Sequence, residues 1–308
     1  MRIAKFCFLL FCLHFPIEGQ TILAQDSTIV VASDSAVELK ILSWNIWMLP
    51  PFIYRTDKRG RAKMIGDLLA ESDYDILVFQ ETFHHGARRR LKSRLKHNFP
   101  YRKGPANRNY ISIKTHSGIW IWSKVPIEKL KQIKFKKTHG LDNKMARKGA
   151  LMVQGEKDGQ RFQVIGTHLN AGGPFFVKLS QVKQIREELM DRYRLFNVPQ
   201  FICGDFNIHK KNPDDYARMM EILEAKDGEL LGDIKFTCGL KRQVGLKVQT
   251  GQCAEDRPVP DVIDYIFVKP NNCKIESVER KVPQISSECP FNDDLSDHQP
   301  VEGHIIFQ

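Results

Sequence analysis

Short apolar runs alternate with helix-like patterns along most of the chain. Runs typical of buried strands occupy residues 39–45, 75–80, 118–123, 150–153, 162–167, 200–203, 262–268 and 304–307. Apolar residues recur at helical spacing over 61–72 and around 179–189. A third helix is predicted from Asn212-Pro213, a cap followed by a first-turn proline. Hairpins mixed with helices predict an α/β domain with two sheets packed face to face and helices outside.

The first residues have the layout of a secretory signal peptide. Basic Arg2 and Lys5 precede the apolar run 6–15, and Pro16 and small residues follow. The run is too short to span a bilayer, which needs about 20 residues. A buried strand or a membrane anchor are the alternatives. We expect residues 1–24 to be a cleaved signal, 25–37 a flexible leader and 38–308 one catalytic domain, in a secreted or periplasmic protein.

Composition and charge narrow the class of protein. The 308 residues are 42% hydrophobic and 27% charged, which excludes a disordered chain, a collagen-like fibre and a small disulfide knot. The formal charge of +11 favours an anionic partner, either nucleic acid, a phosphorylated metabolite or a lipid surface. Two segments concentrate this charge, 84–96 and 129–137. They could contact phosphates or an anionic surface, or simply form a solvated helix face and a charged edge strand.

Five cysteines remain after the predicted signal. None forms a C-x-x-C pair, which disfavours a zinc site. Cys203 lies in an apolar run and is predicted to be a buried free thiol. The other four lie in loop-rich sequence of an exported protein, where one or two disulfides are expected. Local pairing would join Cys238 to Cys253 and Cys273 to Cys289, but the sequence does not choose among the three pairings.

Polar groups that could carry out chemistry follow directly after the predicted strands. They are Asn45, Glu81, His168, Asp205, Asn207, Asp264, Asp297 and His298. Side chains at strand ends can converge on one site. Oxygen ligands such as Glu81, Asp297 and the Asn45 amide suit Mg²⁺, and a histidine beside carboxylates is a common general base. Taken singly, each residue has an ordinary structural alternative as a turn former, a cap or a hydrogen-bonded histidine. Their ordered occurrence is what points to an active site.

In that order and strand context, the sequence resembles the endonuclease/exonuclease/phosphatase superfamily over about residues 38–308. Within it, the chain is most similar to the secreted bacterial sphingomyelinases. The similar segments are Ser43–Leu49, Arg61-Ala62 with Ile65-Gly66, Gly140–Asn143 with Arg147–Gly149, and Val164–Leu169. The resemblance implies a four-layer α/β sandwich and Mg²⁺-dependent cleavage of sphingomyelin to ceramide and phosphocholine.

The resemblance also implies roles for the residues that match. Glu81 with Asn45 would form the Mg²⁺ site, with Asp297 near it, and Mn²⁺ or Co²⁺ are alternative ions. His298 would be the general base oriented by Asp264, and His168 the acid that protonates the leaving oxygen. Asp205 and Asn207 would position water and the phosphoryl oxygens. Lys148 could touch the phosphate, although a surface lysine is the expected outcome. Phe175 and Phe176 could contact a lipid interface, although they are expected to pack in the core.

One segment departs from the family pattern. Its best-studied secreted members carry an aromatic-rich, membrane-entering hairpin, where residues 284–294 of this chain offer only Phe291. Three functions therefore compete: a sphingomyelinase-type enzyme, a secreted deoxyribonuclease-like nuclease or phosphatase, and a non-enzymatic binding module. The last is disfavoured because every acid, base and metal position is filled. The expected partner is a phospholipid at a membrane surface, or nucleic acid under the alternative, and a monomer without a protein partner is expected.

Overall fold

The structure is a computed structural model, and it describes residues 35–50, 57–108, 115–238, 241–244, 247–250, 260–283 and 295–308. The predicted signal, most of the predicted leader, Phe291, Cys253 and Cys289 lie outside these residues. No helix in the described part is long and apolar enough to cross a membrane.

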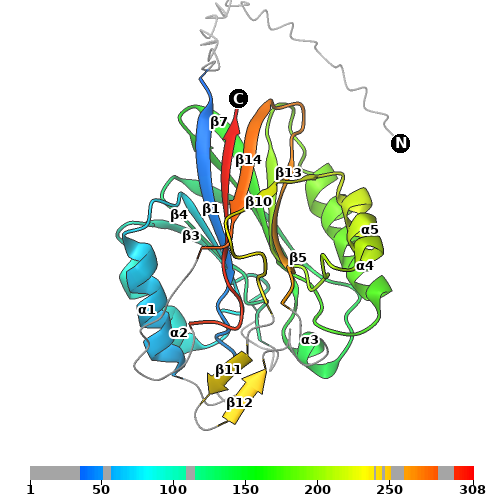
Figure 1. Ribbon diagram of the computed structural model, residues 1–308. Coiled ribbons are helices and arrows are strands. Elements are labelled where there is room, and N and C mark those ends of the chain that lie inside the picture. The colour runs from blue at the N-terminus through cyan, green and yellow to red at the C-terminus, as the bar shows by residue number, and fades with distance from the viewer. Residues whose placement is uncertain are drawn as a thin grey trace, which may run out of the picture. The chain divides into compact units, whose positions relative to one another are not determined.

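Two sheets and one separate hairpin contain all the strands that the structure describes (Figure 1). The seven-stranded sheet has the order β10(Glu229–Leu231), β14(Ile275–Lys281), β15(Val301–Phe307), β1(Val37–Asn45), β2(Ile76–Gln80), β4(Trp120–Ser123), β3(Tyr101–Lys103). The six-stranded sheet has the order β5(Ile127–Lys134), β6(Gly149–Lys157), β7(Gln160–His168), β8(Gln200–Asp205), β13(Asp264–Lys269), β9(Lys226–Asp227). The strands β11(Lys241–Val244) and β12(Lys247–Thr250) form the hairpin. Both sheets are mixed, because β1–β2 and β7–β8 are parallel pairs among antiparallel ones.

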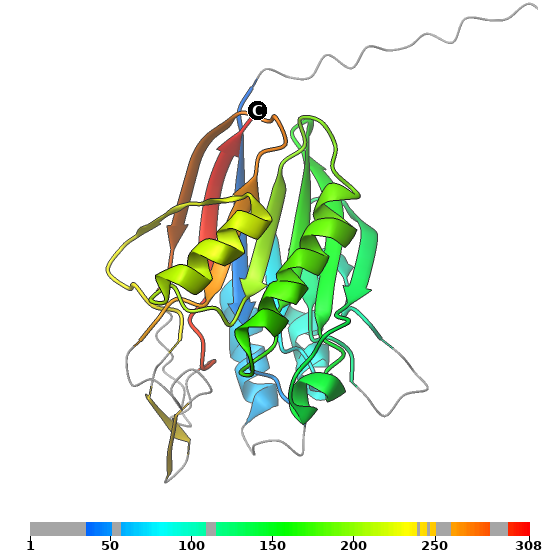
Figure 2. The ribbon, with the colours of Figure 1, turned by 90° about the vertical axis from the view of Figure 1, so that its right-hand side faces the viewer.

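Helices cover the outer face of each sheet (Figures 1 and 2). On the seven-stranded side lie α1(Lys58–Ala70) and α2(His85–Leu95), and on the six-stranded side lie α4(Phe175–Ile185), continued by the π-helical turn η1(Arg186–Asp191), and α5(Pro213–Leu223). The short helix α3(Leu141–Met145) lies in the connection between β5 and β6. The predicted four-layer α/β sandwich is therefore confirmed.

Successive residues of the central strands point to opposite faces of the sheet, and both faces are buried. This explains why these strands appear in the sequence as continuous apolar runs. On β1, Leu39 and Ile41 face the core between the sheets, whereas Leu42 and Trp44 face α1 and α2. On β8, Phe201 and Cys203 face the other sheet and Ile202 faces α4 and α5. A strand buried on both faces has no polar side to show in its sequence.

Local signals set several boundaries. The Asp57 side chain caps α1 at Gly60 N, and the predicted Asn212-Pro213 start of α5 is confirmed, with Asn212 accepting from Asp215 N. The basic segment 84–96 forms α2, and most of 129–137 forms the edge strand β5.

The described cysteines are not paired with one another. Cys203, Cys238 and Cys273 are buried, and Cys203 matches the buried free thiol that its apolar run predicts. The structure thus shows no disulfide among the described residues. The partners in the two local pairings, Cys253 and Cys289, lie outside that part of the chain, so disulfides involving them remain a prediction.

Candidate active site

All of the predicted site residues gather at one end of the two sheets. Asn45, His168 and Asp205 end β1, β7 and β8, Glu81 follows β2, and Asp264 begins the antiparallel β13. In the six-stranded sheet Asp205 pairs in register with both His168 and Asp264. The segment before β15 brings in Asp297 and His298 from the opposite sheet. Asn207 is half-buried, and the other site residues are buried.

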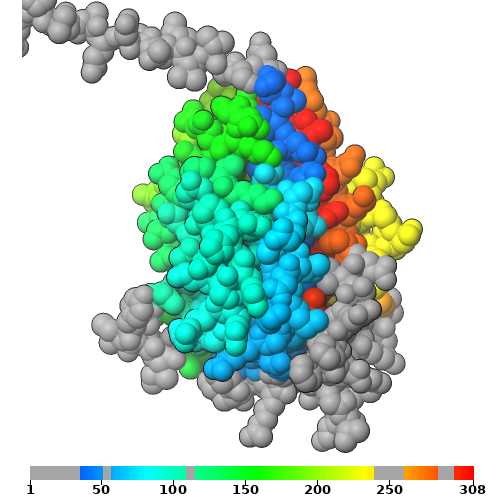
Figure 3. Space-filling view, turned by 90° about the vertical axis from the view of Figure 1, so that its left-hand side faces the viewer, coloured from blue at the N-terminus to red at the C-terminus, as the bar shows by residue number. Residues whose placement is uncertain are grey.

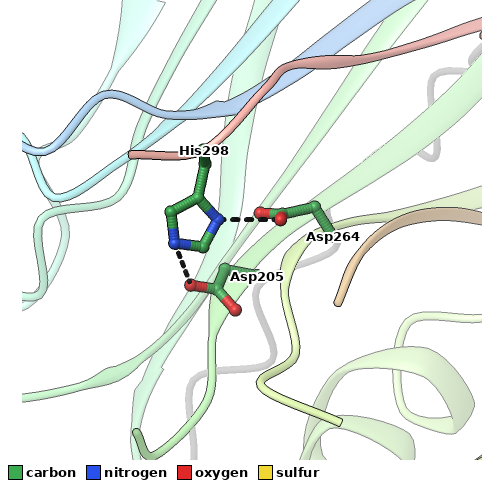
Figure 4. A group of neighbouring side chains, drawn as sticks. All are labelled: Asp205, Asp264 and His298. Atoms are coloured by element: carbon green, nitrogen blue, oxygen red, sulfur yellow. Dashed lines mark hydrogen bonds and ion pairs between the residues drawn. The ribbon is translucent and has the colours of Figure 1, made fainter. Parts of the chain in front are cut away.

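A histidine held between two aspartates forms the centre of the site (Figure 4). His298 Nδ1 lies 2.8 Å from Asp264 Oδ2, and His298 Nε2 lies 3.8 Å from Asp205 Oδ2. Burial alone would lower the pKa of His298, but the charges of Asp264, Asp205 and Asp297 outweigh it and raise that pKa well above its usual value. For the Asp264 carboxyl, burial acts in the other direction and raises the pKa to about 6, although the charge of His298 opposes this shift.

Asp205 organises the groups around it through both of its carboxylate oxygens. Oδ2 accepts from Asn45 Nδ2 at 3.1 Å and lies 3.3 Å from His168 Nε2, while Oδ1 accepts from the Asn207 backbone N–H at 2.9 Å. Burial would raise the pKa of Asp205, but neighbouring His168, His298 and Lys148 lower it overall. The residue before it, Gly204, is required there because a Cβ atom would lie 2.0 Å from the Thr167 carbonyl oxygen.

Lys148 is the residue whose placement differs from the sequence expectation. It is 4% exposed, not a surface lysine, and its Nζ lies 2.9 Å from His168 Nε2 and donates to the Leu169 carbonyl at 2.7 Å. Burial and then the charge of Lys148 lower the pKa of His168 to about 3. The Lys148 pKa itself falls to about 8, mainly through burial. The Arg147–Gly149 segment carried the resemblance, but nothing in its composition indicated that this lysine is buried.

Replacing Lys148 with methionine should therefore raise the pKa of His168. The change removes the neighbouring positive charge and leaves burial as the main cause of the depression. A pH titration of the His168 ring protons by NMR would measure it, with Lys144→Met, an exposed lysine of α3, as the matched control. An unchanged His168 titration in Lys148→Met would show that the two side chains are not electrostatically coupled.

Glu81 is a buried carboxylate that lacks a full set of partners. It is 6% exposed, its φ of 57° lies in the left-handed region, and Oε2 has no hydrogen-bond partner. Gly118 accommodates this backbone, since a Cβ atom there would lie 3.0 Å from Glu81 N. Burial and the like charge of Asp297 raise the pKa of Glu81 to about 7. A divalent cation would stabilise the ionised Glu81 carboxylate against burial and would offset the charge of Asp297. The residues present therefore fit a metal ion here.

Hydrogen bonds fix the neighbours of Glu81 in place. The Asn45 side-chain oxygen accepts from Trp47 N at 3.2 Å, and its backbone carbonyl accepts from Ser296 Oγ. Ser296 Oγ also lies 3.4 Å from Asp297 Oδ1. These contacts tie the segment carrying Asp297 and His298 to the end of β1.

A second group of metal-ligand type lies next to this one. Single ligand atoms of Asp205, Asp264 and His298 lie within 4.8 Å of one another, consistent with a divalent metal site. In this group Asp264 Oδ1 has no partner among the described residues, as is true of Glu81 Oε2. However, Asp264 Oδ2 already contacts His298, and Asp205 Oδ2 already accepts from Asn45. Because these contacts already occupy the second group, Glu81 is the stronger indication of where a cation would bind.

The apolar residues around the site divide between core and surface. Phe175 packs against the core beneath α4, as expected, but Phe176 is 62% exposed, so the expectation that it packs in the core is wrong. Trp47, next to Asn45, is buried. The Asn170–Phe176 loop that follows His168 thus presents one aromatic side chain to solvent.

Several known proteins resemble this chain over most of its length. The sequence profile of the Endonuclease/Exonuclease/phosphatase family matches residues 42–298. Sphingomyelinase C 2 of Leptospira interrogans is 29% identical over 307 residues, which cover 87% of this chain but only 46% of that protein. Phospholipase C of Staphylococcus aureus is 27% identical over 300 residues, covering 87% of each chain.

Among solved structures, a crystal structure of the Staphylococcus aureus beta toxin with bound magnesium ions superposes with a TM-score of 0.73 at 24% identity. The match covers 87% of this chain and 99% of that one. At this level of identity the superposition supports the fold.

Proposed function

Because this chain belongs to the endonuclease/exonuclease/phosphatase family, we propose that it is a phosphodiesterase of the sphingomyelinase C type, which hydrolyses sphingomyelin to ceramide and phosphocholine. The observation that carries the proposal is that relatives with 27–29% identity over 87% of the chain are named sphingomyelinase C or phospholipase C. We further propose that residues 1–24 direct secretion and are removed.

The proposed mechanism divides proton handling between two histidines. His298 would accept the proton of the attacking water, with Asp264, 2.8 Å from Nδ1, orienting the ring and stabilising its charged form. His168 would protonate the leaving ceramide oxygen. Asp205 and Asn207, which are joined by a hydrogen bond, would position the water and the phosphoryl oxygens.

A magnesium ion bound by Glu81, Asn45 and Asp297 would supply positive charge to stabilise the phosphoryl oxygens in the transition state. Its charge would also oppose the carboxylates that raise the pKa of His298, which lets this histidine start a turnover neutral. Similarly, an anionic phosphate beside His168 would offset Lys148 and raise the low His168 pKa, as an acid requires.

The direct test offers the purified protein, with Mg²⁺, three substrates side by side. These are sphingomyelin vesicles, phosphatidylcholine vesicles and plasmid DNA. Release of phosphocholine from sphingomyelin at the highest rate supports the proposal. Cleavage of DNA with intact sphingomyelin would instead establish the nuclease alternative.

Exposed apolar side chains flank the loop after His168 and support a lipid substrate. Leu141 and Met145 on α3 are 81% and 43% exposed, and Phe176 lies in the first turn of α4, at the end of that segment. Two hydrogen bonds join the segments: Asn143 Nδ2 on α3 donates to the Ala171 carbonyl, and the Ala171 backbone N–H donates to Asn143 Oδ1, each at 3.1 Å. The active-site end thus carries side chains able to enter the boundary layer of a bilayer.

Replacing Leu141 and Phe176 together with glutamate should lower turnover on sphingomyelin vesicles at least about tenfold, because burying either side chain contributes roughly 1.5–3 kcal/mol. Turnover of a short-chain, monomeric substrate should change little. Phe196→Glu is the matched control, since this 72% exposed phenylalanine precedes β8 and so lies at the opposite end from Asp205. Equal losses on vesicles and monomers would show that the two residues do not contact lipid.

A further inference from the structure

A cavity of about 320 Å³ lies between α2 and the edge of the seven-stranded sheet. These elements belong to the face of the domain seen in Figure 3. The described residues that line it are His85, Arg88, Arg89, Lys92, Arg102, Gly104, Pro105, Arg108 and Trp120. None of them is acidic, and none is a residue of the proposed catalytic machinery.

Four of the cations that line this cavity form no ion pair with a described carboxylate. Among described residues, no salt bridge reaches Arg88, Arg89, Lys92 or Arg102, although neighbouring Arg94 on the same helix pairs with Asp67 at 3.0 Å. A cluster of cations in a concave site, without a described carboxylate partner, attracts an anion from solution.

Arg88 is the buried member of this cluster of basic residues. It is 9% exposed, and its Nη1 donates to the Thr82 carbonyl at 2.6 Å and contacts His116 Nε2 at 2.7 Å. Burial and the like charge of Arg108 lower the pKa of Arg88 to about 10. Burial, Arg88 and Arg108 likewise lower the pKa of His116 to about 3, so this ring stays neutral and accepts from Arg88. The fold therefore holds a guanidinium in place without a counter-charge in the described residues.

The wall of the cavity contains a hydrogen-bond donor that has no acceptor. Trp120 is 5% exposed, and its indole Nε1–H has no hydrogen-bond partner. The adjacent Cδ1 edge of the ring faces Gly104, another wall residue, because a Cβ atom at Gly104 would lie 3.2 Å from it. A buried N–H without an acceptor is costly unless a ligand supplies one.

From these observations we infer that the cavity is a second anion site, which binds one phosphate group beside the active site. Planar guanidinium forks match the oxygens of a phosphate in two-pronged contacts, and the cavity offers Arg89 and Arg102 besides the buried Arg88. The volume is about ten times the roughly 30 Å³ share of one water, enough for a phosphate and the start of its ester but not for a nucleic-acid helix. Arg88 also holds Thr82, the residue after Glu81, so the site adjoins the catalytic end without sharing its residues.

The test monitors Trp120 while inorganic phosphate is added to the full chain in EDTA, which keeps the proposed metal site out of the measurement. The indole N–H signal is assigned by Trp120→Phe and followed by NMR. Arg89→Gln with Lys92→Gln removes two exposed lining cations. Arg90→Gln with Lys96→Gln makes the same charge change on exposed residues of the same segment that do not line the cavity. A second arm replaces phosphate with vesicles of phosphatidylcholine containing phosphatidylglycerol, compared with pure phosphatidylcholine.

We expect a saturable shift of the Trp120 signal, with affinity at least about tenfold weaker in the lining variant and nearly unchanged in the control. A response to phosphate identifies a soluble phosphate as the ligand. A response confined to phosphatidylglycerol vesicles identifies a lipid headgroup. The inference is overturned if neither probe moves the Trp120 signal, or if both double variants weaken binding equally. Because no arm measures hydrolysis, these results do not depend on the proposed enzymatic activity.

Discussion

Replacing His298 with alanine should lower the rate of phosphodiester hydrolysis more than about a hundredfold, the usual scale for loss of general acid–base catalysis. His298 lies 5% exposed between Asp264 and Asp205, and no other histidine contacts both of these carboxylates among the described residues. His97→Ala, on an exposed histidine after α2, is the control. A His298→Ala enzyme with nearly full activity would remove the proposed base.

Two companion variants separate the roles around His298. Asp264→Asn should also lower the rate, because it removes the charge that supports the imidazolium while keeping the shape of the side chain. His168→Ala should damage hydrolysis of sphingomyelin, whose alkoxide needs a proton, much more than hydrolysis of a nitrophenyl ester. Equal losses on both substrates would mean that His168 is not the acid.

The fold was predictable from the sequence because its central strands are buried on both faces. Continuous apolar runs such as 75–80 and 200–203 can exist only inside a layered structure, and they became β2 and β8. Strands with an exposed face carry the opposite signal. β5, which the sequence offered only as one reading of its basic segment, and β14, which was not predicted, mix charged and apolar residues, and β9 and β10 are too short to form a pattern.

The convergence of site residues could be anticipated, but their electrostatics could not. Asn45, Glu81 and Asp205 each lie at or just after the end of a strand. Because β1–β2 and β7–β8 are parallel pairs, their last residues lie together at one end of the sheets. Whether a nearby lysine is buried depends on tertiary packing. Lys148, 20 residues away in the chain, adds to the effect of burial in lowering the pKa of His168.

The basic helix illustrates the same limit. Its sequence shows a high density of arginine and lysine, which fits a solvated surface, a lipid surface or a nucleic-acid contact equally well. Only the fold reveals that Arg88 points inward among carbonyls while Arg89 and Lys92 line a cavity and Arg90 does not. The role of each basic residue depends on the face of the helix on which it lies. Sequence spacing alone does not fix that face in a helix with so few apolar residues.

Replacing Glu81 with glutamine should abolish metal-dependent activity and weaken Mg²⁺ binding roughly a hundredfold or more. Loss of a residue that only hydrogen-bonds to a metal ligand already costs up to about a hundredfold in metal affinity, and loss of a ligand should cost at least as much. Excess EDTA should have the same effect on the unmodified chain. Glu71→Gln, on an exposed glutamate after α1, is the control. Asp264→Asn distinguishes the two candidate metal centres, because it should retain Mg²⁺ binding if the ion sits at Glu81 and lose it if the ion sits among Asp205, Asp264 and His298.

Stability gives a readout of Glu81 that does not require turnover. Its pKa is raised from 4.5 to about 7 in the fold, so between these values the unfolded chain has lost the proton that the folded chain keeps. The metal-free protein should therefore lose stability as pH rises from 4.5 to 7 through this group, and Glu81→Gln should flatten that part of the profile. Added Mg²⁺ should restore stability at pH 7, by about 2.7 kcal/mol at a hundred times its dissociation constant, in the unmodified chain but not in the variant. A Mg²⁺-induced rise in melting temperature that survives Glu81→Gln would place the ion elsewhere in the chain.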